Sequence, residues 1–383
     1  MLPMPAATLA VRYFMVALLA GLLFHAGPLR ARPAGNLGEA WRAWQAAVQG
    51  NAPPDELLPL ARAVHDALPK SPKTPKQMHA KAVAALNLGG VLRDLRQWKE
   101  ARRRFHESVV LFTKALGPSA PELVDPLWEE ARAADRAARA KPGEVFALYE
   151  RIDGILALQG QEAVPQRIRL HVEFAEVAYR REHLDLARRQ VARVRAIIAR
   201  QAAHDYMMEG RIALLEARIA EREHRFDDVI SLHEEALADY RHHLSKTDHE
   251  VLRLHRVLAR RLESAGRSDE ATTHLLAIGR ALAAKPKRIA VVGDYMPVYR
   301  APIRMRPSAF GRKYRQGRVV VTFTVTREGR VRDIRITESS PPGVFDKAVI
   351  EAVRRFRYAP RFRDGEPVDT PGVTYTWEFR MEG

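Results

Sequence analysis

In the last stretch of the chain, residues 317–380, the spacing of the apolar residues is that of a small sheet carrying one helix. Residues 319–325 place apolar side chains at every second position, the period of a strand with one buried face. Residues 331–337 indicate a second strand, in which the alternation of apolar and polar residues shifts by one position. This shift predicts a β-bulge or an outward-turned Asp333. Gly329 lies between the two segments and can adopt the positive φ of a tight turn.

A helix and a final strand complete this pattern. Apolar residues at helical spacing form one stripe, and the helix must end before Pro360. The stripe consists of Phe345, Ala348, Val349, Ala352, Val353 and Phe356. Residues 373–379 then show the cleanest alternation in the protein. The predicted element order is β-β-α-β.

These segments resemble the C-terminal domain of the TonB family, and the resemblance covers about the last quarter of the chain. It is carried by Gly317-Arg318-Val319, Gly329-Arg330-Val331, Ser339 to Asp346, Ala352 to Pro360, Asp364-Gly365-Glu366-Pro367 and the aromatic last strand. The chain departs from the family pattern ahead of the first strand, where Tyr299-Arg300 replaces the usual Tyr-Pro pair.

The resemblance implies that the last strand has a free edge, to which the "TonB box" segment of an outer-membrane receptor adds as an extra strand. The expected edge comprises Thr374, Tyr375, Thr376, Trp377, Glu378 and Phe379. Thr374, Thr376 and Glu378 should face away from the helix. Val373, Tyr375, Trp377 and Phe379 should pack on Phe345, Val349, Val353 and Phe356.

A lead-in segment precedes the first strand and carries a candidate basic patch. Residues 300–318 hold seven basic residues and no acid, and several prolines exclude a helix there. The candidate binding residues are Tyr299, Arg300, Arg304, Arg306, Arg312, Lys313 and Arg315. Simple solubility is the other explanation for this charge.

Residues 36–284 are helical in pattern and repeat. Four equivalent turns are Trp98-Lys99-Glu100-Ala101, Leu184-Asp185-Leu186-Ala187, Phe226-Asp227-Asp228-Val229 and Ser268-Asp269-Glu270-Ala271. Their last residues are 86, 42 and 42 positions apart, and Pro142-Gly143-Glu144-Val145 falls near the middle of the long gap. The preceding helices carry small residues at Gly89, Ala175 and Ala259, which would let antiparallel helices cross closely.

This period, from about residue 76 to 284, resembles tetratricopeptide (TPR) repeats in a longer form. An irregular helical bundle is the alternative. Residues 40–68 should add one or two capping helices. A repeat array leaves a concave groove for a peptide or protein, which is a binding surface rather than a sign of chemistry.

The N-terminal residues carry an export signal. Tyr13 to Phe24 is apolar and follows Arg12, a length that suits a signal peptide and is too short to span a bilayer. We expect cleavage within residues 26–31 and a periplasmic protein; the alternative is an inner-membrane anchor facing the periplasm. The TonB family anchor pairs a Ser with a His one helical turn apart, whereas this segment has no Ser and only His25 at its far end.

Composition and motifs argue against an enzyme. The chain has no cysteine, which excludes thiol catalysis, zinc-thiolate sites and disulfides. Neither a nucleophile elbow, a phosphate loop nor a His-Glu-x-x-His motif occurs. His242, His243, His249 and His255 lack metal-ligand spacing, so we expect no metal and no cofactor. The net charge of +17 is best explained by arginines on solvated helix faces, and nucleic-acid binding is not expected.

The sequence therefore predicts four regions: a signal peptide or anchor (1–31), a TPR-like α-helical solenoid (36–284), a basic Pro-containing linker (285–315) and a small α+β TonB C-terminal-like domain (316–383). The expected function is binding of outer-membrane TonB-dependent receptors by strand addition. The alternative is a non-transducing periplasmic scaffold for other envelope proteins. In the family, the Ser and His of the anchor contact the proton-driven motor of the inner membrane. The absence of this pair and of the family's long proline-rich spacer favours the scaffold.

Overall fold

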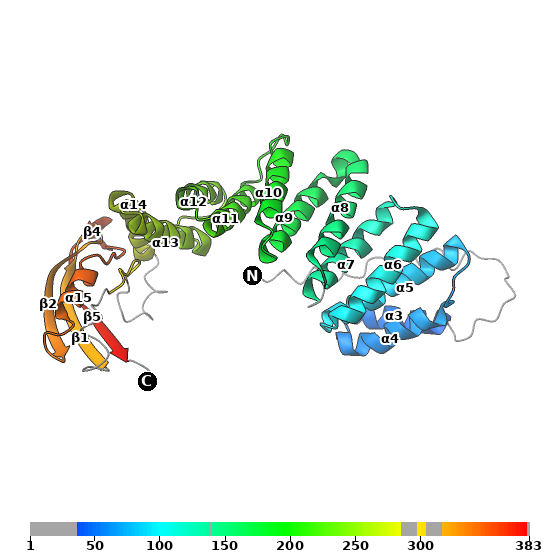
Figure 1. Cartoon of the computed structure of the whole chain (residues 1–383), viewed down its shortest axis with the longest axis horizontal. Helices are drawn as coiled ribbons and strands as arrows, with labels where there is room; N and C mark the ends of the chain where they lie inside the picture. Colours follow the sequence, from blue (N-terminus) through cyan, green and yellow to red (C-terminus); the bar gives the residue numbers. More distant parts are fainter. Residues whose placement is uncertain (1–36, 138–139, 285–296, 304–315, 381–383) are drawn as a thin grey trace. The chain divides into compact units, whose positions relative to one another are not determined.

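The computed structural model describes residues 37–137, 140–284, 297–303 and 316–380 of the chain. The chain divides into two compact units, unit 1 from Met1 to Arg200 and unit 2 from Gln201 to Gly383. Figure 1 labels their helices and strands. The predicted signal peptide, most of the linker and Arg304 to Arg315 of the lead-in segment lie outside the described residues.

The described residues of unit 1 form helices joined by short turns. They are α3 (Leu37–Gln49), α4 (Pro54–Ala67), α5 (Pro75–Asp94), α6 (Trp98–Leu116), α7 (Val124–Arg136), α8 (Pro142–Leu158), α9 (Val164–Arg180) and α10 (Leu184–Ile198). Short 3-10 turns, η1 (Pro121–Leu123) and η2 (Gly160–Ala163), lead into α7 and α9. One or two capping helices were expected within residues 40–68, and the structure has two, α3 and α4, the first of which begins at Leu37.

Among the described residues of unit 2, four helices come first and the small sheet domain follows. The helices are α11 (Tyr206–Arg222), α12 (Phe226–Tyr240), α13 (His249–Ser264) and α14 (Ser268–Ala283). The second part contains β1 (Gln316–Val325), β2 (Val331–Ser340), α15 (Asp346–Val353), β3 (Arg361–Arg363), β4 (Glu366–Val368) and β5 (Thr370–Arg380).

The repeat predicted from the sequence is confirmed by where the second helix of each hairpin begins. Helices α6, α8, α10, α12 and α14 start at the first residue of the five equivalent turns. The fourth residue of every turn is buried: Ala101, Val145, Ala187, Val229 and Ala271 are at most 1% exposed. Four of these helices are preceded, two residues earlier, by a residue with positive φ, namely Arg96, Glu182, His224 and Gly266.

Close helix crossing explains the small residues of the repeat. A Cβ on Gly89 would lie 2.6 Å from the Phe105 ring, so only glycine lets α5 approach α6 at this point. Ala175 and Ala259 occupy the equivalent position and are fully buried. The short distance between the helices therefore limits the size of the side chain at the crossing point.

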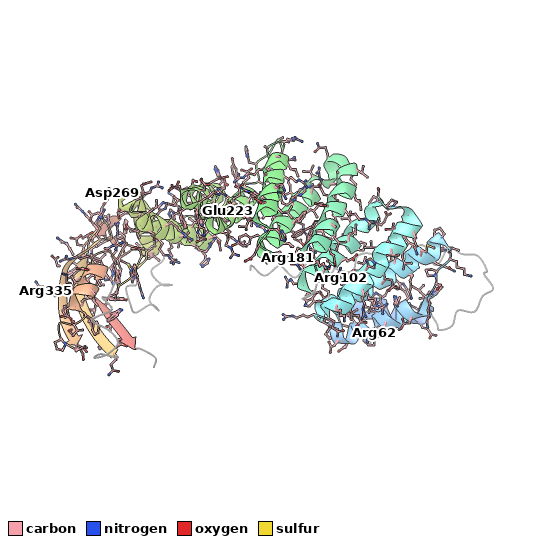
Figure 2. The ribbon with its side chains drawn as sticks, in the orientation of Figure 1. Arg62, Arg102, Arg181, Glu223, Asp269 and Arg335 are labelled. Atoms are coloured by element: carbon pink, nitrogen blue, oxygen red, sulfur yellow. The ribbon has the colours of Figure 1, made fainter. Side chains whose placement is uncertain are left out.

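Many arginines bridge neighbouring hairpins of unit 1. Figure 2 shows Arg102 and Arg181 among the side chains that project from these helices. Arg102 donates to Glu144 at 2.8 Å, and Arg181 donates to Asp135 at 2.8 Å. The Arg102 pair is partly exposed, whereas the Arg181 pair is largely buried, with side chains 17% and 9% exposed.

A more buried network surrounds Glu173 on α9. Its carboxylate accepts hydrogen bonds from Trp128 Nε1 (3.0 Å), Tyr149 OH (3.0 Å) and Arg132 Nη2 (2.6 Å). Burial raises the pKa of Glu173, but the bonds from Arg132 outweigh this and hold the pKa below its ordinary value. The network joins α7, α8 and α9.

The C-terminal sheet has the strand order β2-β1-β5, and all of its pairs are antiparallel. Helix α15 packs against β1 and β2. Apolar side chains from the strands, α15 and the segment after it form one core. Its buried members are Ala301, Val319, Val321, Phe323, Val325, Val331, Phe345, Val349, Ala352, Val353, Phe356, Tyr358 and Val373.

The slip in the second strand is a β-bulge, as predicted. Thr322 pairs with Arg335 and Thr324 with Arg332, so β2 holds one more residue than β1 there. Asp333 lies in this stretch with φ of 54°. The extra residue returns the apolar side chains of β2 to the core face.

The structure adds one element that the β-β-α-β prediction lacked, the hairpin of β3 and β4. Asp364 and Gly365 form its two-residue turn, with φ of 52° and 84°. Positive φ at both central positions is the signature of an Asp-Gly hairpin turn. The dipeptide could have identified this hairpin from the sequence.

Candidate binding edge

β5 lies at one edge of the sheet. β1 occupies the centre and pairs with β2 on one side and β5 on the other, with Val321 opposite Tyr375 and Val319 opposite Trp377. Within the described part of the chain, no strand pairs with the outer side of β5. An edge strand of this kind presents backbone N–H and C=O groups that a further strand can pair with.

Side chains of β5 alternate between the core and solvent. Val373 is buried, and Tyr375 and Trp377 are half-buried. The Trp377 ring lies 5.7 Å from Phe345, and the Tyr375 ring meets Phe356 edge-on at 5.0 Å. Thr374, Thr376 and Glu378 are exposed, as predicted from the alternation. The side chain of Phe379 lies outside the described residues.

Arg318 on β1 connects the two edges of the sheet on its exposed face. Its Nε lies 2.9 Å from Glu338 Oε1 on β2, and its Nη1 donates to Glu378 Oε1 on β5. All three side chains are largely exposed, so the stabilisation from these pairs is small. Their effect is to place opposite charges in a row beside the edge.

Two of the predicted lead-in residues reach the domain. Tyr299 and Arg357 exchange backbone hydrogen bonds of 3.0 and 3.1 Å, and Ala301 is buried in the core. The Arg300 guanidinium lies 5.6 Å from the centre of the Tyr375 ring, a cation–π distance. Arg300 is thus held beside β5 and Tyr299 beside Arg357, whereas Arg304, Arg306, Arg312, Lys313 and Arg315 lie outside the described residues.

A buried ion pair, which the sequence analysis did not identify, joins this domain to the last helical hairpin. Arg357 Nη1 lies 2.7 Å from Glu263 Oε1, and the two side chains are 3% and 7% exposed. Arg357 Nη2 also donates to Thr272 Oγ1 at 2.6 Å and to the Glu328 carbonyl at 3.2 Å. Burial lowers the pKa of Arg357, and the charge of Glu263 opposes that shift.

Two glycines allow the backbones to approach closely around this pair. A Cβ on Gly279 of α14 would lie 2.3 Å from the Pro360 carbonyl oxygen. Gly329 has φ of +75°, and a Cβ there would lie 2.1 Å from the Tyr358 carbonyl oxygen. Tyr358 N donates to the Gly329 carbonyl at 2.9 Å, which ties the β1–β2 turn to the chain after α15.

The β3–β4 hairpin completes the contact with α14. The Arg280 guanidinium lies 5.5 Å from the centre of the Phe362 ring, and Arg330 of the β1–β2 turn donates to Asp269 at 2.8 Å. The last repeat is therefore packed directly on the domain, through β3, β4 and the β1–β2 turn. Thr374, Thr376 and Glu378 stay exposed in this arrangement.

The residues that the structure describes contain no group of three or more His, Cys, Asp or Glu side chains placed to hold a metal ion. In the same residues, no helix combines the length and apolar character that crossing a bilayer requires. His255, one of the histidines considered from the sequence, lies beside His274 rather than beside His242, His243 or His249, with Nδ1 atoms 2.9 Å apart.

Comparisons with known proteins place the similarity in the C-terminal region. The family profile described as "Gram-negative bacterial TonB protein C-terminal" matches residues 307–381. Protein TonB of Pseudomonas aeruginosa is 39% identical over 71 residues, which is 18% of this chain and 21% of that protein. Protein TonB of Klebsiella pneumoniae is 36% identical over 104 residues, 26% of this chain and 38% of that protein. The chain thus spans well under half of the length of these relatives.

Two solved structures show a partial likeness to this chain. A Podosopora anserina putative kinesin light chain with nearly identical TPR-like repeats aligns with a TM-score of 0.42 and 22% identity, covering 54% of this chain and 96% of that one. The assembly chaperone of RpL4 (Acl4) aligns with a TM-score of 0.40 and 16% identity, covering 66% and 91%.

The family match and the observed sheet agree with the resemblance inferred from the sequence, and the TonB family is not a family of enzymes. The chain therefore carries a TonB C-terminal domain preceded by helical repeats.

Proposed function

We propose that this protein acts in TonB-dependent transport and binds an extended segment of an outer-membrane receptor by strand addition to β5. The observation that carries the proposal is the position of β5 at the sheet edge, in a domain matched by the TonB family. The guest strand would obtain its affinity from main-chain hydrogen bonds and its selectivity from neighbouring side chains. Export to the periplasm would bring the domain to the periplasmic side of such receptors.

The side chains beside the edge suggest which guest segments would be preferred. Thr374 and Thr376 are exposed and can hydrogen-bond to a polar neighbour. Glu378 lies next to Arg318, and Arg300 lies over Tyr375, so charges of both signs border β5. A guest carrying a cation near Glu378 would be favoured over one carrying an acid there.

The test is a titration of the full-length protein with a synthetic peptide from the periplasmic N-terminal segment of a TonB-dependent receptor. Strand addition predicts that N-methylation of alternate peptide residues abolishes binding, because only alternate amides face β5. Glu378→Lys should shift preference toward peptides with an acid at the facing position. Glu351→Lys, an exposed residue of α15, is the matched control. Binding that is insensitive to N-methylation at every position would refute strand addition.

The scaffold function remains the second candidate, and the packing of α14 supports it. The ion pair of Arg357 with Glu263 and the contacts of Gly279 attach the domain to the last repeat. Energy transduction in this family uses a long extendable spacer, whereas here a helical hairpin packs on the domain itself. Direct energy transduction and the scaffold function are distinguished by two observations in cells. These are whether residues 1–31 stay attached to the protein, and whether the protein co-purifies with the proton-driven motor of the inner membrane. A soluble mature chain starting near residue 27 to 32 would exclude direct transduction.

A further inference from the structure

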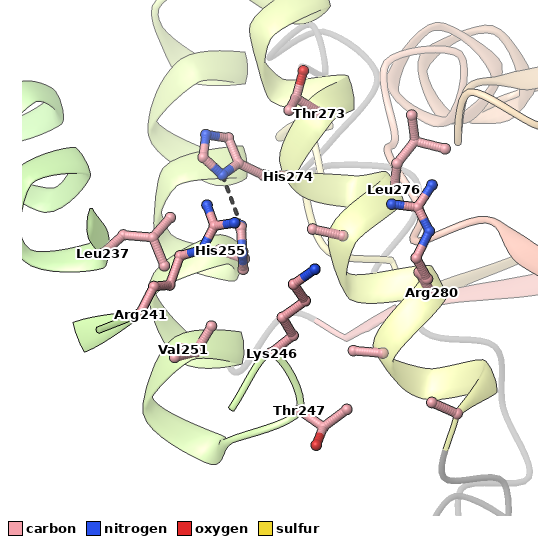
Figure 3. A pocket seen from close by; sticks show the side chains of 13 residues that line it. Leu237, Arg241, Lys246, Thr247, Val251, His255, Thr273, His274, Leu276 and Arg280 are labelled. Carbon is pink, nitrogen blue, oxygen red and sulfur yellow. Dashed lines mark hydrogen bonds between the residues drawn. The ribbon is translucent and has the colours of Figure 1, made fainter. Parts of the chain in front are cut away.

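A pocket of about 550 Å³ lies in unit 2, on the helical hairpins rather than on the sheet (Figure 3). It is formed by the end of α12, the loop that follows, α13 and α14. Apolar residues such as Leu237, Val251 and Leu276 line it together with the basic residues Arg241, Lys246 and Arg280. This volume falls in the range of sites that hold small molecules.

The walls of the pocket are largely apolar. Leu237, Val251 and Ala281 are buried, and Leu276 and Ala277 are half-buried along the α14 side. An apolar part of a ligand placed against these side chains would remove its own surface and theirs from water, which favours binding. The walls therefore favour a ligand with a hydrocarbon or aromatic part.

Positive charge surrounds this apolar interior. Arg241, Lys246 and Arg280 line the pocket, and none of the described lining residues is Asp or Glu. Figure 3 shows Lys246 extending between the two helices, with Arg241 and Arg280 on either side. Arg241 and Lys246 form no ion pair with any described carboxylate, so their charge is available to a ligand.

The polar groups at the back of the pocket are uncharged near neutral pH. His255 and His274 share one hydrogen bond between their Nδ1 atoms, in which one ring donates and the other accepts. Burial lowers the pKa of His255 to about 4, with a further contribution from His274, and burial also lowers the pKa of His274. The net charge felt by a ligand thus comes from the arginines and the lysine.

We propose that this pocket binds a small apolar molecule that ends in a carboxylate. The apolar body would lie against Leu237, Val251 and Leu276, and the carboxylate would lie between Arg241 and Lys246. A cationic ligand of the same shape would be repelled, and a neutral one would gain only the apolar contact. This site is separate from the β5 edge and does not depend on the proposed receptor binding.

The experiment compares three ligands with the same hydrocarbon chain, octanoate, octanol and octylamine, by calorimetric titration of the full-length protein. Octanoate should bind about tenfold more tightly than octanol, and octylamine should bind more weakly than octanol. Arg241→Gln combined with Lys246→Gln should lower octanoate affinity to the level of octanol and leave octanol binding unchanged. Ala277→Phe should weaken the binding of both octanoate and octanol, because the larger side chain would fill part of the pocket.

Arg260→Gln is the matched control, because Arg260 is an exposed arginine of α13 that does not line the pocket. It should leave all three affinities unchanged, and the circular dichroism of every variant should match that of the native protein. Equal affinity for octanoate and octanol, no binding of octanoate, or an equal loss of octanoate binding in Arg260→Gln would overturn the proposal.

Discussion

Replacing Glu263 by alanine should loosen the contact between the TonB C-terminal domain and the last helical hairpin. The change leaves the Arg357 guanidinium buried, 3% exposed, without the carboxylate that lies 2.7 Å from it. Removing one partner of a buried ion pair costs about 3–5 kcal/mol. The hydrogen bonds of Arg357 to Thr272 and the Glu328 carbonyl remain, so we expect the lower end, about 3 kcal/mol.

The assay is native-state hydrogen exchange of the full-length protein, followed peptide by peptide. A loss of about 3 kcal/mol corresponds to exchange about 100-fold faster in the β1–β2 turn and in the segment around Tyr358. Peptides from residues 37–137 should not change, because they belong to unit 1. Glu351→Ala, which removes an exposed carboxylate from α15, should leave exchange in the turn within about twofold of the native rate.

The double variant Glu263→Met with Arg357→Met tests the electrostatic reasoning. Burial lowers the pKa of Arg357 despite the neighbouring charge of Glu263, so the pair does not fully recover its desolvation cost. Replacing both charges should therefore cost at least about 2 kcal/mol less than the sum of the two single changes. The ion pair does not hold this contact if Glu263→Ala accelerates hydrogen exchange less than about fivefold. The same conclusion follows if the free-energy cost of the double variant equals the sum of the costs of the two single changes.

Three further predictions concern other parts of the chain. Gly329→Ala should destabilise the domain by more than about 2 kcal/mol, measured by urea unfolding, because the new Cβ would meet the Tyr358 carbonyl oxygen. Gly343 has a similar φ but open space around it, so Gly343→Ala should cost only about 1 kcal/mol. Phe345→Ala should cost about 3–5 kcal/mol and abolish receptor-peptide binding by unfolding the domain, which circular dichroism would show. Burial raises the pKa of Asp153, but bonds from His171 and Arg167 outweigh burial and lower the pKa to about 2. Because this pKa is lower in the folded than in the unfolded protein, the ionised Asp153 stabilises the fold above about pH 4, and this stabilisation is lost as the pH falls toward 2. Asp153→Asn should remove that part of the pH dependence from thermal unfolding curves.

Local patterns in the sequence were sufficient to identify the longer strands and the starts of the repeat helices. The alternation in residues 319–325 and 373–379 identified β1 and β5, and the phase slip at Asp333 identified the bulge. The 42-residue spacing identified where α10, α12 and α14 begin. Each of these signals lies within one element or one turn, where the side-chain period follows from the backbone geometry.

The hairpin of β3 and β4 was missed for a different reason. Its strands have three residues each, too few to show a period, and only the turn Asp364-Gly365 marked it. The ion pair of Arg357 was missed because its partner Glu263 lies far away in the sequence, on a different kind of element. Neither residue differs in its local pattern from an exposed one.

The sequence by itself determined the repeat, the three long strands, the apolar stripe of α15 and the family of the C-terminal domain, since these depend on spacing between near neighbours. Only the tertiary structure decided that β5 has an open side, that α14 packs on β3 and β4, and that Arg241, Lys246 and two histidines line one pocket. The physical reason is that burial and charge pairing depend on which surfaces meet in space, and surfaces formed by distant segments leave no periodic signal along the chain.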